Sequence, residues 1–437
     1  MFWPDQAAAA LEYRVQLSVQ ARDNAALSEI FLHDEPEAAR QAAHLEGMRF
    51  PWESANSGTE QCIFNAEDHI VGDISTAFRQ YWRATHDRAW LKTSGFPVIE
   101  GIAQFYASRV STDPMLGAAA YHILYTEGPD EAHGNISDST YGNAVAAAAL
   151  RSAYELASLV DVTPNATFKR IADRLVLPYN ASADYHPEYR ESEWDARQGQ
   201  LIKQADTVLI YYPLAIENIS ATTRRHDVET YAALQNPHGV AMTWGIQTIV
   251  SLDIGDVAAA ARYFRTGFEV FARPPFYTWH EGNGTDGSSS QGAPNLVTGA
   301  GGFLQSVWAG YGGVRFERDD ALVIRSPRPL PNSTALRLRG VHYLGARLDI
   351  EARDDGTWTV ALSSTSPTGA PALELQMKGS LVPDEGGATG SALPSSSTII
   401  DTATAATPPA VPITHAPLTR RVGQEGHVLR RRGTNEA

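Results

Sequence analysis

The sequence lacks the features that mark several protein classes. Cys62 is its single cysteine, so the chain cannot form an intramolecular disulfide, and cysteine usage leaves the redox compartment open. No apolar run approaches the roughly 20 residues of a membrane span. Basic residues are outnumbered, with 35 Lys and Arg against 50 Asp and Glu, which gives a net charge of −15. Because nucleic acids and anionic membranes repel an acidic protein, we expect a small neutral substrate and neither of those partners.

The first 20 residues also lack the basic segment and apolar core of a signal peptide. Sequons for N-glycosylation are nevertheless frequent, at six of the 13 asparagines: Asn135, Asn165, Asn180, Asn218, Asn283 and Asn332. The sequons predict a secreted or vacuolar protein. To reconcile the two observations, we expect the chain to begin partway through its parent protein.

Acidic residues crowd one segment, Tyr125–Asn143, which carries Glu127, Asp130, Glu131 and Asp138 without a Lys or Arg. Like charges raise each other's pKa, so at least one of these carboxyls should keep its proton to a higher pH than usual, as a general acid must. The turn at Gly128-Pro129 presents the acids from a stiff corner. A solvated acidic loop near a helix N-terminus explains the same composition equally well.

Helical periodicity dominates the first 313 residues. Apolar residues between Asp68 and Trp90 recur at helical spacing, and His69 and Asp73 share the neighbouring stripe. Further helices are predicted at residues 1–32, 98–110, 144–160, 168–176, 201–213, 239–252, 256–272 and 299–310. Paired helices in this number predict an α/α barrel, in which long loops gather at one end. That geometry would bring Trp52, Glu131, Lys203 and Glu281 to a common mouth.

Beyond Gly313 the period changes to two, which predicts short strands of a small sheet or sandwich. From Glu385 onward Gly, Ala, Ser, Thr and Pro dominate, a composition typical of disorder. The predicted organisation is therefore a helical catalytic domain at residues 1–313, a β-sandwich at 314–384 and a disordered tail at 385–437.

Two further loops suit a sugar. Trp52 beside Glu53 offers a ring for the C–H face and an acid for the hydroxyls, although a loop anchored by a core Trp has the same sequence. Trp279-His280-Glu281 precedes a glycine-rich loop, which allows a close approach of backbone to a small ligand or forms ordinary turns.

Taken in order, the motifs resemble glycoside hydrolase family 65, which contains the acid trehalases and related α-glucoside hydrolases and phosphorylases. The resemblance extends over nearly all of residues 1–380. It rests on FPWES (Phe50–Ser54), HIVGDISTAFRQYW (His69–Trp82), GPDE (Gly128–Glu131) with His133 and Tyr141–Asn143, KQAD (Lys203–Asp206) and NLVTGAGGFLQSVWAGYGG (Asn295–Gly313).

The resemblance implies an (α/α)6 barrel with a C-terminal β-sandwich, here without the family's N-terminal region and first barrel helix. It implies inverting hydrolysis of an α-linked glucoside, with α,α-trehalose as the first candidate. Glu131 is then the general acid and Glu281 the general base, with their carboxyls about 6.5–9.5 Å apart. Lys203 and Gln204 would hold the glucose, with Trp52, Glu53 and His69 in the same pocket. No cofactor and no metal is expected.

Two alternatives stay open. A disaccharide phosphorylase of the same family would use phosphate in place of water and would need no protein base, which the carboxylate at Glu281 argues against. A catalytically impaired fragment that only binds glycans is the other. The oligomeric state is not indicated by the sequence.

Overall fold

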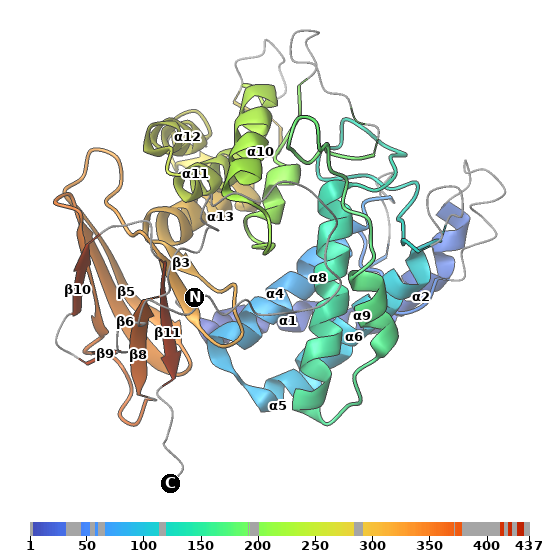
Figure 1. Cartoon of the computed structure of the whole chain (residues 1–437), viewed down its shortest axis with the longest axis horizontal. Helices are drawn as coiled ribbons and strands as arrows, with labels where there is room; N and C mark the ends of the chain where they lie inside the picture. The colour runs from blue at the N-terminus through green and yellow to red at the C-terminus, as the bar shows by residue number, and fades with distance from the viewer. Residues whose placement is uncertain are drawn as a thin grey trace. The chain divides into compact units, whose positions relative to one another are not determined.

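In the computed structural model (Figure 1) the chain forms two compact units, Met1–Gly310 and Tyr311–Ala437. The described residues are 3–31, 45–52, 57–59, 66–112, 119–190, 192, 201–283, 292–370, 372–377, 411–414, 418–421 and 426–431. None of the helices in these ranges is long and apolar enough to span a bilayer.

The first unit is helical. Its helices are α1 (Pro4–Gln16), α2 (Ser18–Phe31), α4 (His69–Thr85), α5 (Arg88–Trp90), α6 (Phe96–Arg109), α8 (Thr140–Ala157), α9 (Ala166–Ala172), α10 (Ala221–Leu234), α11 (Thr243–Asp253), α12 (Val257–Glu269) and α13 (Val297–Gln305). Short helical turns are η1 (Leu91–Gly95), η2 (Ser158–Val160), η4 (Thr207–Ile210) and η5 (Ser306–Tyr311), and β1 (Ala272–Arg273) pairs with β2 (Thr278–Trp279).

Helix α8 lies between two hydrophobic cores. Its middle and C-terminal part, including Leu150, packs with α4, α6 and α9 (Figure 1). Its first turns, including Val145, pack with η4 in a second core to which α10 and α11 also contribute. The Ser139 hydroxyl caps its N-terminus by accepting the Gly142 N–H at 3.0 Å, which typically stabilises a helix by about 1 kcal/mol. The acidic segment ends at this cap, so a well-packed helix fixes one end of it.

The sequence and the structure differ at two places in this unit. The helix expected at Leu201–Pro213 is wrong, because only η4 forms there and Asp206 has φ −129° and ψ −94°, outside the helical region. Helix α10 was not expected, because its sequence ATTRRHDVETYAAL is polar around most of its circumference. It begins at a Ser220 cap, whose hydroxyl accepts the Thr223 N–H at 2.9 Å.

The second unit consists of two antiparallel sheets. Its strands are β3 (Val314–Arg315), β4 (Leu322–Arg325), β5 (Ala335–Tyr343), β6 (Ala346–Arg353), β7 (Thr357–Leu362), β8 (Leu373–Met377), β9 (Val411–Pro412), β10 (Leu418–Arg421) and β11 (Gly426–Arg431). The sheet orders are β10-β7-β6-β5 and β3-β4-β11-β8-β9. Trp358 of β7 is 1% exposed and meets His427 of β11 edge-on, with ring centroids 5.0 Å apart, so the sheets pack face to face.

The expectation of a disordered tail at 385–437 is wrong for its described residues. Strand β11 pairs with both β4 and β8, and Val428 and Leu429 are fully buried. Ile413, Val428 and Leu429 are buried, although residues 385–437 as a whole have the composition of a disordered chain. A mainly helical unit followed by a smaller β unit confirms the expected fold class.

Candidate active site

The acid loop, which we define as Gly128–His133, is fixed at its base between α6 and α8. Thr126 and Ile136 exchange two backbone hydrogen bonds of 2.8 and 2.9 Å across it. The Thr126 hydroxyl and the Glu127 N–H both donate to the Ala66 carbonyl, at 2.8 and 3.0 Å. These bonds present Asp130 inward, where it is fully buried, and leave Glu131 with 13% of its side chain exposed.

The KQAD segment, Lys203–Asp206, lies against the acid loop. The Lys203 ammonium forms a short ion pair with Glu131 Oε2, and Gln204 Nε2 lies 3.4 Å from Glu131 Oε1. Gln204 Nε2 also donates to the Pro129 carbonyl. The structure therefore brings together three of the predicted site residues, Glu131, Lys203 and Gln204, from segments about 70 positions apart.

Burial shifts the titration of the carboxyls around Glu131. Burial, followed by the charges of Glu67 and Glu131, raises the pKa of Glu127 to about 7. Burial also raises the pKa of Asp206 to about 7, and the neighbouring Asp130 carboxylate adds to this increase. The pKa of Asp130 is raised by burial as well. The segment that the sequence singled out therefore does contain a carboxyl, that of Glu127, whose pKa is raised to near neutrality.

His69 lies at the start of α4, with 7% of its surface exposed, between two carboxylates. Its Nδ1 is 3.0 Å from Asp73 Oδ2 and its Nε2 is 3.2 Å from Glu67 Oε2. Burial alone would lower the pKa of His69, but the hydrogen bonds with Asp73 and Glu67 outweigh it and raise the pKa to about 10. Both ring nitrogens are therefore hydrogen-bonded to carboxylates, so neither is left to bind a sugar hydroxyl.

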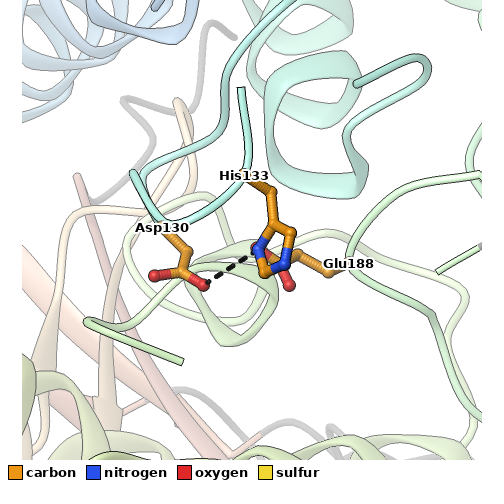
Figure 2. Close-up of side chains that lie close together, drawn as sticks. All are labelled: Asp130, His133 and Glu188. Carbon is orange, nitrogen blue, oxygen red and sulfur yellow. Dashed lines mark ion pairs between the residues drawn. The ribbon is translucent and has the colours of Figure 1, made fainter. Parts of the chain in front are cut away.

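Asp130, His133 and Glu188 are the one group in the described part of the chain whose possible metal-ligating atoms lie within 4.8 Å of one another (Figure 2). His133 Nδ1 lies 4.0 Å from Asp130 Oδ2. Two carboxylates and an imidazole can hold a divalent cation. His133 and Asp130 also interact directly with each other, so this trio does not by itself indicate a metal.

Glu281 follows β2 and is held by the backbone of Ala293 and Ala241. The Ala293 N–H donates to Glu281 Oε2 at 2.8 Å, and the Ala241 N–H donates to the Glu281 carbonyl at 3.0 Å. Within the described ranges, no hydrogen bond or ion pair joins Glu281 to Glu131, Lys203 or Gln204.

One segment, Gly239–Thr243, nevertheless contacts both sides. A Cβ atom at Gly239 would lie 2.5 Å from the Lys203 carbonyl oxygen, and the Ala205 N–H donates to the Thr243 hydroxyl at 3.1 Å. Ala241, midway between them, binds Glu281. The KQAD segment and Glu281 are therefore attached to the same five residues.

The remaining predicted residues lie in the Phe50–Ser54 segment. Trp52 follows the buried Phe50 and is 38% exposed. Glu53 lies outside the described residues.

Several acids that interact with these groups were not among the predicted site residues: Glu67, Asp73, Asp130 and Asp206. Asp73 lies on the same helix stripe as His69. Asp130 and Asp206 each lie in a motif that also contains a predicted site residue, GPDE and KQAD, and this adjacency was the available signal. Glu67 lies two residues before His69, and the fold is what brings it within electrostatic reach of Glu131.

A mainly helical unit followed by a smaller β unit is the fold class expected of an α/α-barrel glycoside hydrolase. Residues 2–167 match the family model described as "Glycosyl hydrolase family 65 central catalytic domain". The chain belongs to glycosyl hydrolase family 65.

Several curated relatives share the family. The chain is 35% identical over 354 residues to a protein-glucosylgalactosylhydroxylysine glucosidase of Danio rerio, covering 80% of this chain and 50% of the relative. It is 32% identical to a kojibiose hydrolase of Flavobacterium johnsoniae (71% and 42% covered) and 28% identical to an acid trehalase of Emericella nidulans (83% and 33% covered). The chain thus spans about half the length, or less, of these relatives.

A solved structure described as a putative kojibiose phosphorylase from human microbiome has the same fold. Its TM-score is 0.59 at 15% identity, with 79% of this chain and 50% of that chain covered. This likeness confirms the expected α/α-barrel class with a β domain, and at this identity it bears on the fold alone.

Proposed function

We propose that the chain hydrolyses a terminal α-linked glucosyl group with inversion of configuration. The observation that carries the proposal is Glu131, a largely buried carboxyl at the end of a fixed loop, contacted by Lys203 and Gln204. The attachment of Glu281 to the same Gly239–Thr243 segment supports a second acid at the same site.

In this mechanism each acid has one task. Protonated Glu131 donates its proton to the glycosidic oxygen as the bond to the anomeric carbon breaks. Glu281 takes a proton from a water that attacks the anomeric carbon from the opposite face, which requires the carboxyls to stand about 6.5–9.5 Å apart. The products are glucose of inverted anomeric configuration and the free hydroxyl of the leaving group.

The side chains of Lys203 and Gln204 end at Glu131, so hydroxyls of the glucose beside the scissile bond would lie within their reach. Trp52 offers an exposed ring on which a sugar can pack, and Glu53 follows it in the sequence. No cofactor takes part in these steps. A phosphorylase is the second candidate, and the carboxylate of Glu281 argues against it because phosphate needs no protein base.

The relatives guide the choice of substrate. The substrates that these relatives' names state all contain a glucosyl group. They are glucosylgalactosylhydroxylysine, kojibiose and trehalose. We place glucosylgalactosylhydroxylysine first, because the relatives with that activity include the one at 35% identity, and α,α-trehalose after it.

A secreted or vacuolar location remains part of the proposal. Asn135, Asn165, Asn218 and Asn332 are exposed, as N-glycosylation requires.

The test is glucose release by the wild-type chain, Glu131→Gln and Glu281→Gln from glucosylgalactosylhydroxylysine, kojibiose and trehalose at mildly acidic pH. Loss of a general acid or base should lower kcat/KM by about 10²- to 10⁴-fold. Glu229→Gln, a surface glutamate of α10, is the matched control and should be unchanged.

Three outcomes would count against the proposal. Equal rates for wild type and Glu131→Gln would show that Glu131 is not the general acid. Release that depends on phosphate, with a glucose phosphate as product, would favour the phosphorylase. Calorimetric binding of these glucosides without turnover would indicate a glycan-binding fragment.

A further inference from the structure

We propose that Asp206 is a positioning residue, which sets the direction of Glu131 by holding the backbone of the acid loop. The inference rests on the proposed role of Glu131 as the general acid. It assigns no contact with substrate to Asp206, which is fully buried.

The acid loop and the KQAD segment are joined by reciprocal hydrogen bonds between buried aspartates and backbone. Asp206 Oδ2 accepts the Asp130 N–H at 3.0 Å, and Asp130 Oδ1 accepts the Lys203 N–H at 2.7 Å. Each aspartate therefore holds the other segment's main chain. The peptide unit held by Asp206 links Pro129 to Asp130, so a shift of this unit reaches Glu131 through the single residue Asp130.

The Asp206 carboxyl is tightly packed against the turn at Gly128. A Cβ atom at Gly128 would lie 2.6 Å from Asp206 Oδ2, so only glycine lets the turn approach the carboxyl this closely. On the other side, the Ala205 N–H donates to the Thr243 hydroxyl of α11 at 3.1 Å. The carboxyl of Asp206 therefore lies against the turn that carries Glu131, and the backbone just before Asp206 is bonded to the start of α11.

The acceptor oxygen, and not the charge, is what this role needs. Burial and the neighbouring Asp130 raise the pKa of Asp206 to about 7, so at mildly acidic pH the Asp206 carboxyl is neutral while it still accepts the Asp130 N–H. Its second oxygen, Oδ1, accepts no hydrogen bond from the described residues. An asparagine can reproduce this arrangement. A leucine has the same branching at Cγ and removes the acceptor.

The experiment compares Asp206→Asn and Asp206→Leu by steady-state kinetics and combines Asp206→Leu with Glu131→Gln in a double-mutant cycle. Asp206→Asn should keep kcat within about threefold of wild type. Asp206→Leu should lower kcat by about 10- to 100-fold with KM nearly unchanged, because a misplacement of about 1 Å at the reacting group costs up to about 100-fold. In the Glu131→Gln background the same change should have almost no further effect.

The outcomes separate this inference from the proposed function. If Glu131→Gln is as active as wild type, the proposed general acid is wrong. If Glu131→Gln is impaired but the two changes are additive, or if Asp206→Leu keeps full kcat, Asp206 does not position Glu131. Circular dichroism at the assay temperature checks that each variant is folded. Should Asp206→Leu fail to fold, a tenfold or larger loss of kcat in folded Asp206→Asn would overturn the inference by itself.

Discussion

The buried imidazole of His69 yields a prediction about stability as a function of pH. It lies between Glu67 and Asp73, with hydrogen bonds of 3.2 and 3.0 Å. Replacing His69 by Gln leaves both carboxylates without their cation. Removing one member of a buried ion pair typically costs about 3–5 kcal/mol, and we expect a loss of unfolding free energy in that range at pH 6.

The pH dependence follows from the direction of the pKa shift. The pKa of His69 is raised from its ordinary value near 6.5 to about 10 in the folded protein, because its bonds to Asp73 and Glu67 outweigh burial. The folded state therefore holds this proton more tightly than the unfolded chain. The stabilisation is complete below pH 6.5 and is lost progressively as pH rises from 6.5 to 10. The difference between wild type and His69→Gln should shrink over the same range.

The assay is urea unfolding followed by circular dichroism at 222 nm, which reports the helices of the first unit, at pH 6 and pH 9.5. His238→Gln, at an exposed position, is the control and should match wild type within about 0.5 kcal/mol at both pH values. A His69→Gln variant as stable as wild type at pH 6 would refute the reasoning. A loss of equal size at pH 6 and pH 9.5 would show that His69 stabilises by packing and not as a cation.

Two further predictions concern packing. Gly128→Ala should lower both kcat and the melting temperature, because the new methyl would lie 2.6 Å from Asp206 Oδ2. Gly301→Ala is the control, because a Cβ at Gly301 meets open space, and it should be neutral or slightly stabilising in the same thermal melts. An active, equally stable Gly128→Ala would contradict the tight turn. Val428→Asp should destabilise the β unit by several kcal/mol, since it places an unpaired charge at a fully buried position of β11; unchanged thermal unfolding would mean that this strand is not part of the sheet.

Elements that bury one face could be predicted from the sequence. In α4 the apolar residues Ile74, Phe78 and Trp82 recur at helical spacing, and all three are buried. Strand β7, Thr357–Leu362, is one of the short strands that the period of two beyond Gly313 predicts, because its residues alternate and it ends at turns. Periodicity identifies such elements because burial of a continuous stripe is what stabilises them.

The failures occur where tertiary contacts override local pattern. The apolar run Leu201–Pro213 is fully compatible with a helix, but Lys203 and Asp206 bond to the acid loop, and the backbone leaves the helical region at Asp206. Strand β11 looks unstructured in isolation and is stabilised by β4 and β8. In neither case does the local sequence contain the partner that decides the structure.

The same limit applies to the candidate site. Glu131, Lys203 and Gln204 were predicted together from motif order, and the structure joins them directly. The neighbourhood of His69 and Asp73 was predicted from their i, i+4 spacing, whereas the bond of His69 to Glu67, which precedes α4, was not. The grouping of Glu281 with the KQAD segment depends on Gly239–Thr243, a connection that no spacing reveals.

The position of β11 has a consequence for the order of events during synthesis. It follows all the other described strands in sequence, yet it lies in the middle of its sheet, between β4 and β8. Those two neighbours leave the ribosome earlier and cannot find their common partner until residues 426–431 emerge. The helical unit, whose contacts lie among earlier residues, can by then be fully folded, so the β unit should be the late and slow step of maturation and the one most in need of a chaperone.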